Sequence, residues 1–205
     1  DIRDPMIVSD TINQAVSVVG RPNLAINSAG ILRTGAFKEL DYDTFKMVID
    51  INLMGSRNFA AAVAPHMKMG DHLALIASLA GVCGVYTQAA YAASKFGVVG
   101  LSEVLRLELK HEGIDVSVIC PGEIETPLLA HERKHGSETT KNLNAFAGVL
   151  TVDHACNGIL KGLAKREFMI TPGVKAIFTR ELARKASGLF RKIVDSRLEK
   201  ELSRF

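Results

Sequence analysis

HLALIASLAGVCGVYTQAAYAASKFG, residues 72–97, is the stretch that decides the fold. It begins with an apolar run of strand length, continues through a glycine-containing loop and ends in a segment with helical character. Tyr91 and Lys95 are four positions apart in that segment, so a helix places them on one face, one turn apart. Ser78 stands where the strand ends. This order predicts a strand, a loop and a helix that bring a serine, a tyrosine and a lysine together.

The proposed pairing of Tyr91 with Lys95 has a chemical meaning. A neighbouring ammonium favours the phenolate and lowers a phenol pKa that is normally near 10. We therefore expect Lys95 to lower the pKa of Tyr91, which could then exchange a proton with a substrate oxygen near neutral pH. The hydroxyl of Ser78 could hydrogen-bond the same oxygen. The pair by itself also fits an amphipathic helix with an exposed lysine, so its meaning depends on the rest of the chain.

The composition indicates one globular domain over residues 1–205, because 47% of the residues are hydrophobic and 23% are charged. A net charge of +3 is too small to indicate a nucleic-acid partner. Cys83, Cys120 and Cys156 are far apart and form no CxxC motif, which favours a reducing, cytoplasmic compartment over a disulfide framework. No stretch is long and apolar enough to span a bilayer, and no N-terminal signal pattern is visible.

Apolar runs and helical periodicity alternate along the chain. We expect buried strands at 24–27, 72–77, 116–120 and 168–171, and helices at 4–19, 43–68, 89–112 and 152–165, with a polar, helix-capable stretch at 126–145. Strands separated by helix-length segments indicate βαβ units, and therefore an α/β fold with a doubly wound parallel sheet. Ligands bind at the carboxyl ends of the strands in such a sheet.

Five motifs, three of which fall at those strand ends, follow one another in an order and spacing that resemble the short-chain dehydrogenase/reductase family of Rossmann-fold NAD(P)-dependent oxidoreductases. They are Asn27-Ser28-Ala29-Gly30, Asn52 in Asp50-Ile51-Asn52-Leu53, Ile76-Ala77-Ser78, Tyr91-Ala92-Ala93-Ser94-Lys95, and Pro121-Gly122 followed by Thr126. The resemblance covers about residues 1–130.

The resemblance implies four catalytic residues. Tyr91 would be the general acid in reduction and the base in oxidation. Lys95 would also hold the nicotinamide ribose, and Ser78 would orient the substrate carbonyl. Asn52 would kink its helix and hold a water that links Lys95 to solvent. The implied cofactor is NADP or NAD, with NADP favoured slightly, and the implied cofactor-binding residues are Asp1, Ile2, Asn27, Ala29, Gly30, Tyr91, Lys95, Pro121, Gly122 and Thr126.

The chain departs from the family pattern in two places. Ser28 replaces the second asparagine of the Asn-Asn-Ala-Gly run. The glycine-rich phosphate-binding turn and its βαβ unit, which the family places before the position of Asp1, are absent from this sequence. We therefore expect the natural protein to be longer, and the 205-residue chain alone to bind dinucleotide poorly. The residue that usually distinguishes NAD from NADP would lie in that segment.

The C-terminal extension, residues 174–205, carries nine Lys/Arg, four acids and apolar residues at helical spacing. Such a helix could cover the domain's own core, pack in a dimer, or lie on an anionic membrane surface. It resembles the extension of family members that act on lipid-like ketones, including 3-ketosphinganine, retinoids and steroids. We therefore expect a hydrophobic ketone or alcohol as substrate, with residues 126–145 closing over it as a lid.

Further residues are candidates for the substrate pocket: Cys83, Tyr86, Gln88, Glu123 and Leu128. His131 and His135 have helical metal-ligand spacing, but no third ligand is evident and we expect no metal. The faces of helices 43–68 and 89–112 suit a homodimer or homotetramer. The alternatives to an NAD(P)-dependent oxidoreductase are a sugar-nucleotide epimerase, which needs a larger C-terminal domain, and a nucleotide-binding or membrane-associated scaffold without activity.

Overall fold

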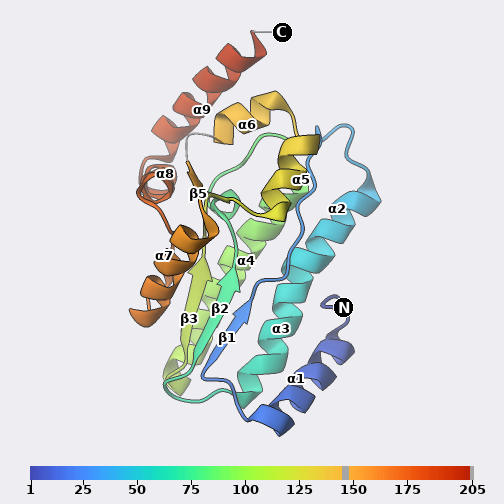
Figure 1. The fold of residues 1–205 in the computed structure, drawn as a ribbon, viewed down its shortest axis with the longest axis vertical. Helices are drawn as coiled ribbons and strands as arrows, with labels where there is room; N and C mark the ends of the chain where they lie inside the picture. The colour runs from blue at the N-terminus through green and yellow to red at the C-terminus, as the bar shows by residue number, and fades with distance from the viewer. Residues whose placement is uncertain (145–147, 204–205) are drawn as a thin grey trace.

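The computed structural model describes residues 1–144 and 148–203. A parallel sheet of four strands forms its centre, in the order β1-β2-β3-β6 (Figure 1). The strands are β1 (Leu24–Asn27), β2 (His72–Ile76), β3 (Asp115–Ile119) and β6 (Met169–Ile170). Leu24 pairs with His72, His72 with Asp115, and Val118 with Met169. The predicted strands and the α/β class are confirmed.

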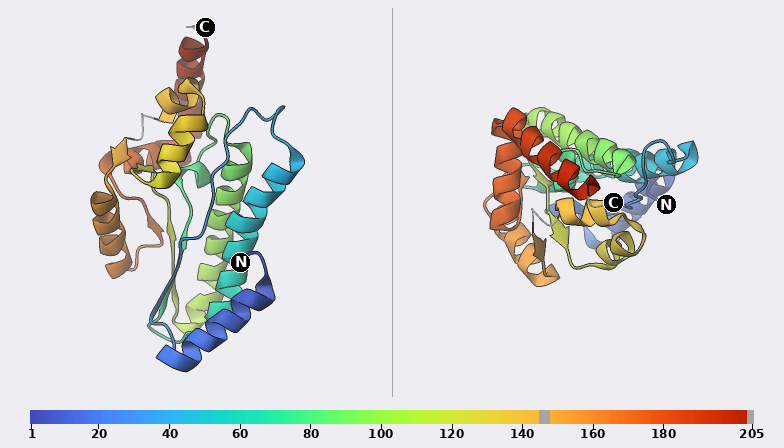
Figure 2. Two further views of the ribbon diagram at one scale, coloured as in Figure 1. Left: turned by 45° about the vertical axis from the view of Figure 1, so that its right-hand side comes forward. Right: turned by 90° about the horizontal axis from the view of Figure 1, so that it is seen from above.

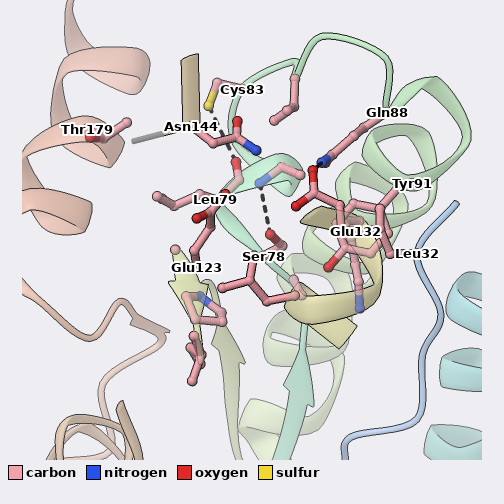
Figure 3. Close-up of a pocket in the computed structure, with 18 of the residues that line it drawn as sticks. Leu32, Ser78, Leu79, Cys83, Gln88, Tyr91, Glu123, Glu132, Asn144 and Thr179 are labelled. Carbon is pink, nitrogen blue, oxygen red and sulfur yellow. Dashed lines mark hydrogen bonds between the residues drawn. The ribbon is translucent and has the colours of Figure 1, made fainter. Parts of the chain in front are cut away.

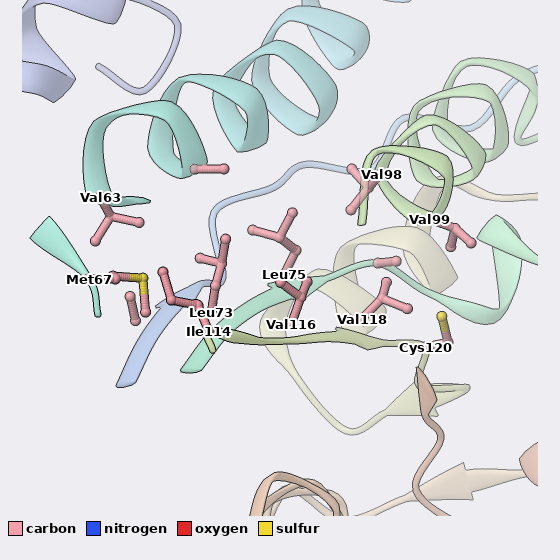
Figure 4. Close-up of a cluster of buried hydrophobic side chains, with 13 residues drawn as sticks. Val63, Met67, Leu73, Leu75, Val98, Val99, Ile114, Val116, Val118 and Cys120 are labelled. Atoms are coloured by element: carbon pink, nitrogen blue, oxygen red, sulfur yellow. The ribbon is translucent and has the colours of Figure 1, made fainter. Parts of the chain in front are cut away.

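Helices cover both faces of the sheet, as the doubly wound architecture requires. On one face, α3 and α4 pack on the side chains that alternate along β2 and β3, among them Leu73, Leu75, Val116 and Val118 (Figure 4). The intervening side chains Ala74 and Ile119 point to the other face, where they pack with α7 and β6. The principal helices of these two layers are α1 (Pro5–Val19), α2 (Tyr42–Ile49), α3 (Gly55–Val63), α4 (Ala89–Glu108) and α7 (Val152–Ala164).

The long helix expected at 43–68 is interrupted. It consists of α2, a π-helical turn η1 (Asp50–Met54), α3 and a final 3-10 turn η2 (Ala64–His66). The side chain of Asp41 caps α2 by accepting a hydrogen bond from the Thr44 amide at 2.8 Å. The helix expected at 89–112 is α4 followed by a 3-10 turn η4 (Leu109–Glu112), and it ends at Gly113, whose φ of 73° suits a helix C-cap.

Strand β1 differs from the buried strand that its composition predicted. It is an edge strand that pairs with β2, and Leu24 and Ile26 are 44% and 40% exposed while Ala25 and Asn27 are buried. The reason is that α3 covers one face of β1, and the side chains of alternate residues point to opposite faces. A continuous apolar run therefore does not guarantee burial on both faces.

An upper layer of short elements lies beyond the carboxyl ends of the strands (Figures 1 and 2). It contains a small parallel pair that the sequence did not predict, formed by β4 (Glu123–Ile124) and β5 (Val149–Leu150). The lid stretch forms two helices, α5 (Pro127–His135) and α6 (Glu138–Asn144). The C-terminal extension also forms two, α8 (Val174–Lys185) and α9 (Ser187–Leu202), and α9 packs against both α6 and α8. This layer encloses the space above the sheet.

Candidate active site

A cavity of about 440 Å³ lies between the carboxyl ends of the strands and the upper layer (Figure 3). The strand ends and the loop after β2 form its floor, and α5, α6, α7 and α9 contribute its walls. Many of the wall residues are apolar: Leu32, Leu79, Leu129, Ile159, Phe190 and Ile193. The position agrees with the general rule for open parallel sheets, and the composition suits an organic ligand with apolar parts.

Ser78 is held at the tip of β2. Its backbone is extended, and it caps the short 3-10 turn η3 (Leu79–Gly81) by accepting a hydrogen bond from the Ala80 amide at 3.1 Å. The amide of Ala77 is tied to Ile119 of β3, so two strands fix the serine's position. Its side chain lines the cavity.

Tyr91 and Lys95 occupy successive turns at the start of α4, as the spacing predicted, and both line the cavity. The ammonium of Lys95 lies 5.5 Å from the centroid of the Tyr91 ring, a cation–π distance. It also donates a hydrogen bond of 2.9 Å to the carbonyl of Ile76, near the end of β2. The side chain of Lys95 is 4% exposed, so this lysine is buried beside the end of β2 and is not a surface charge.

The pKa of Tyr91 does not follow the expected direction. Burial raises it above the ordinary value of 10.0, and the hydrogen bond from Ser78 opposes that effect only in part. Burial also lowers the pKa of Lys95 to about 8. The expected lowering of the Tyr91 pKa is therefore wrong for this structure, because burial of the phenol is the largest effect on that pKa. Tyr91 is a neutral phenol at neutral pH, which suits a proton donor.

Asn52 lies in the π-helical turn η1 and is fully buried. Its side-chain amide donates to the Ile31 carbonyl at 2.9 Å and to the Ser94 hydroxyl at 3.0 Å, and it accepts from the Ile31 amide at 2.8 Å. These bonds join α4 to the loop after β1. The role of Asn52 in holding a relay water stays a prediction.

The loop after β1 brings main chain close to the lysine. The side chain of Asn27 is buried, where it accepts from the Ala29 amide at 3.1 Å and donates to the Ser56 hydroxyl at 3.0 Å. A Cβ added to Gly30 would lie 3.3 Å from Oδ1 of Asn52 and 3.5 Å from Nζ of Lys95. The hydrogen bond between Asn27 and Ala29 thus holds the turn without lining the cavity. Gly30 lines the cavity and leaves room for a ligand beside Lys95.

The remaining cofactor candidates fall into two groups. Pro121, Gly122 and Thr126 line the cavity at the end of β3, and Thr126 caps α5 through its hydroxyl. A nicotinamide ring with its ribose fits these residues, because Lys95, Gly30 and Gly122 line the same cavity. Asp1 and Ile2 are not among the cavity-lining residues: the carbonyl of Ile2 accepts from Asn58 at 3.1 Å, beside α3. Their adenine-binding role stays a prediction.

All five substrate candidates line the cavity: Cys83, Tyr86, Gln88, Glu123 and Leu128. Burial raises the pKa of the Cys83 thiol to about 11, and its Sγ lies 3.5 Å from the Leu79 carbonyl. The residue is therefore a packing group and not an activated nucleophile. Glu123 forms an ion pair of 3.2 Å with Arg133 of α5.

Several cavity residues were not selected as pocket candidates from the sequence. They come from the loop after β1, from α7 and from the upper layer: Ser28, Glu132, Asn144, Val152, Cys156, Thr179, Phe190, Ile193, Val194 and Arg197. Those from α9 are informative, since Phe190, Ile193 and Val194 follow the helical spacing that the sequence showed, and their helix face points into the cavity. The sequence left three alternatives for the extension, and this face of α9 corresponds to the one in which the helix covers its own domain. The side chains of His131 and His135 lie outside the described residues.

Comparison with known proteins shows the family of this chain. The family model for short chain dehydrogenase matches residues 1–137. A 3-dehydrosphinganine reductase of Danio rerio is 32% identical over 169 residues, covering 81% of this chain and 51% of that protein. The oxidoreductase UcpA of Escherichia coli is 35% identical over 131 residues, covering 62% of this chain and 50% of that protein.

Solved structures agree on the fold. A short chain dehydrogenase/reductase from Burkholderia phymatum in complex with NAD superposes with a TM-score of 0.78 at 22% identity, covering 92% of this chain and 74% of that one. ElxO with NADP bound gives a TM-score of 0.75 at 21% identity, covering 86% and 76%. The chain spans about half the length of the curated relatives it matches. With the family model covering more than half of its residues, the chain belongs to the short-chain dehydrogenase/reductase family.

Proposed function

We propose that the protein is an NAD(P)-dependent oxidoreductase that interconverts a hydrophobic ketone and its secondary alcohol. The observation that supports this most is the convergence of Ser78, Tyr91 and Lys95 on one apolar cavity at the strand ends. Hydride would come from a bound nicotinamide, and relatives of known fold bind NADP or NAD. We favour NADP slightly.

The chain's own groups would supply the proton and the alignment. In reduction, the neutral Tyr91 phenol donates its proton to the oxygen of the carbonyl as that oxygen gains negative charge. The Ser78 hydroxyl donates a hydrogen bond to the same oxygen and stabilises the developing charge. Lys95, held by the Ile76 carbonyl, stabilises the phenolate that remains and faces the position of the ribose. Asn52 holds the loop after β1 and α4 in a fixed relative position. We also propose that Asn52 holds the water that carries a proton from solvent to Lys95.

A Tyr91→Phe variant tests the assignment. We expect turnover to fall by about 10²–10⁴ because the proton donor is lost, while nicotinamide nucleotide binding, followed by fluorescence titration, stays within a few fold. The matched control is Tyr42→Phe on the exposed side of α2, which should keep full turnover. Undiminished turnover in Tyr91→Phe would contradict the mechanism, and a wild-type protein that binds nicotinamide nucleotide but shows no turnover would favour the scaffold alternative.

The proposed substrate is a lipid-like ketone or alcohol, because the walls of the cavity are largely apolar. A curated relative is named for the reduction of 3-dehydrosphinganine, which supports this class. Each methylene buried contributes about 0.8 kcal/mol, or roughly fourfold in kcat/KM. A series of ketones of increasing chain length should show that rise until the cavity is filled. Preferential reduction of short hydrophilic ketones would contradict it.

We propose a cytoplasmic location with peripheral contact at an anionic membrane through the outer side of α9. Its apolar side lines the cavity, while Leu189, Arg191 and Lys192 are exposed. Among the described residues, none of the helices combines the length and the apolarity needed to cross a membrane. Sedimentation with phosphatidylserine vesicles should be reduced by charge reversal at Arg191 and Lys192, and equal binding to neutral vesicles would exclude the electrostatic contact.

We also propose that the protein is a homodimer or homotetramer. Exposed apolar side chains on α4, namely Phe96, Val104 and Leu107, support a contact through this helix. Leu107→Glu should shift the protein to a lower mass in sedimentation analysis. An unchanged mass would place the contact elsewhere.

A further inference from the structure

Thr87 has a backbone conformation that its side chain disfavours. Its φ is 60°, in the left-handed region, and it occupies the third position of a turn in which the Gln88 amide donates to the Val85 carbonyl at 3.1 Å. Where a turn needs a positive φ at this position, glycine or asparagine is usual, because a β-branched side chain crowds the backbone there. The turn directly precedes α4, the helix that carries Tyr91. A strained residue so close to a reacting group persists only where the surrounding contacts hold it.

The contacts that hold Thr87 come from the lid helix α6. The Thr87 hydroxyl donates to the Tyr86 carbonyl at 2.7 Å and lies 2.7 Å from the hydroxyl of Thr140, which is fully buried. The Thr140 hydroxyl lies 2.7 Å from that of Ser137, whose oxygen accepts from the Thr140 amide at 3.1 Å. Each hydroxyl has one proton to donate, so a consistent direction of donation runs from Ser137 through Thr140 and Thr87 to Tyr86. A glycine in place of Thr87 would relieve the strain but would break this chain of hydrogen bonds.

The same turn is connected to the walls of the cavity and to the loop after β1. The Thr87 carbonyl accepts from the Gly35 amide, in that loop, at 2.9 Å. Tyr86 and Gln88, on either side of Thr87, both line the cavity, and Gln88 is 5% exposed (Figure 3). The Gln88 carbonyl accepts from the Ala92 amide of α4 at 2.8 Å. The conformation of Thr87 therefore determines the position of the first turn of α4.

We propose that Thr140 and Thr87 form a latch through which the lid helix α6 holds this turn in its strained conformation and so positions Tyr91 for proton transfer. This rests on the proposed ketone reduction, in which Tyr91 is the proton donor. The other side of Tyr91 is held independently, since its carbonyl accepts from the Ser94 hydroxyl at 2.7 Å and that hydroxyl accepts from Asn52 at 3.0 Å. When the lid moves away, Thr87 is free to return to a negative φ and the start of α4 shifts. Thr140 is thus a positioning residue, and it makes proton transfer depend on a closed lid.

Removing the Thr140 hydroxyl tests the latch. Thr140→Val keeps the shape of the side chain and should lower kcat by about 10–100-fold, because misplacing a reacting group by about 1 Å costs up to about 10²-fold in rate. Nicotinamide nucleotide binding, followed by fluorescence titration, should stay within a few fold. Thr140→Ser keeps the hydroxyl and should retain most of the turnover. The matched control is Thr139→Val in the same helix, which should keep kcat, because Thr139 is also buried but, among the described residues, makes no hydrogen bond to the turn.

The strain of Thr87 provides a second test. Thr87→Gly removes the partner hydroxyl but also removes the cost of the positive φ, so the turn no longer needs the latch. In that background Thr140→Val should change kcat by less than about twofold. The double variant should also turn over faster than Thr140→Val alone, whereas contacts that act only by packing predict a slower double variant, because it lacks more atoms. Losses that add in the double variant would overturn the proposal, as would an undiminished kcat in Thr140→Val.

Hydrogen exchange separates the latch from the proposed activity. A peptide covering residues 84–95 contains the hydrogen-bonded amides of Gln88 and Ala92, and should exchange faster in Thr140→Val than in wild type or in Thr140→Ser. The measurement needs no ketone. A wild-type protein that shows this difference and reduces no ketone contradicts the oxidoreductase activity and retains the latch, whereas equal exchange in Thr140→Val and wild type contradicts the latch itself. Thermal melts of each variant check that the fold is kept.

Discussion

Replacing Lys95 by methionine should stabilise the fold while it removes the proposed activity. The lysine is 4% exposed, and burial moves its pKa from 10.5 to about 8. A difference of that size corresponds to roughly 3 kcal/mol of free energy by which folding disfavours the ammonium. Methionine keeps a flexible apolar side chain of similar length and has nearly the same helix propensity.

Part of this gain is offset, because the Ile76 carbonyl loses the hydrogen bond of 2.9 Å that Lys95 donates. Such a bond contributes about 1–3 kcal/mol when the donor is charged. We therefore expect Lys95→Met to raise the free energy of unfolding at pH 7 by roughly 0–2 kcal/mol, which is a rise of at most about 8 °C in Tm for a chain of this size. Turnover should be lost, because the group that stabilises the phenolate is gone.

The pH dependence gives the sharper test. The folded pKa of Lys95 lies below the unfolded one, so between about 8 and 10.5 the unfolded chain binds more protons and the wild-type stability rises with pH. The advantage of Lys95→Met is thus complete below pH 8 and disappears as the pH approaches 10.5. Urea denaturation at several pH values between 7 and 10 measures it, with Lys110→Met at an exposed position as control. A variant less stable than wild type at pH 7, or a difference that does not change with pH, would refute the reasoning.

Three further predictions concern the framework of the site. Gly81→Ala should lower the free energy of unfolding by about 1–3 kcal/mol and reduce turnover, because its Cβ would lie 2.6 Å from a backbone carbonyl oxygen of α4. The control is Gly84→Ala, which has open space around it and should change neither the stability nor the turnover. Asn52→Ala should cost about 1–3 kcal/mol in denaturation experiments because it removes the partner of the Ile31 amide and carbonyl; a neutral result would mean that water replaces it. Burial lowers the pKa of His72, so stability should fall as the pH drops below about 6.5, and His72→Gln should flatten that slope.

Several features of the fold could be predicted because they depend on neighbours in the sequence. The four parallel strands and α4 follow from local hydrophobic periodicity, and the positions of Ser78, Tyr91 and Lys95 follow from the helix repeat and from the strand end. The family resemblance implied a kink at Asn52, where the π-helical turn lies, whereas the hydrophobic pattern alone shows a continuous helix there. The break between α8 and α9 was not predicted, because it interrupts a helical pattern without a proline.

The direction of the Tyr91 pKa could not be obtained from the sequence. Spacing places a lysine beside the phenol, but the depth at which the phenol is buried decides that its pKa rises. The same reason applies to Cys83, whose raised pKa excludes an activated thiol.

By itself the sequence determined the α/β class, the family motifs and the three side chains proposed to act on the reacting oxygen. Only the tertiary structure decided what surrounds that oxygen. Glu132 of α5 and Phe190 of α9 enter the cavity because segments far apart in the chain pack over the strand ends, and no local pattern encodes which faces will meet. Contacts within one helix turn or one strand are fixed by backbone geometry, whereas contacts between distant helices depend on the packing of the whole domain.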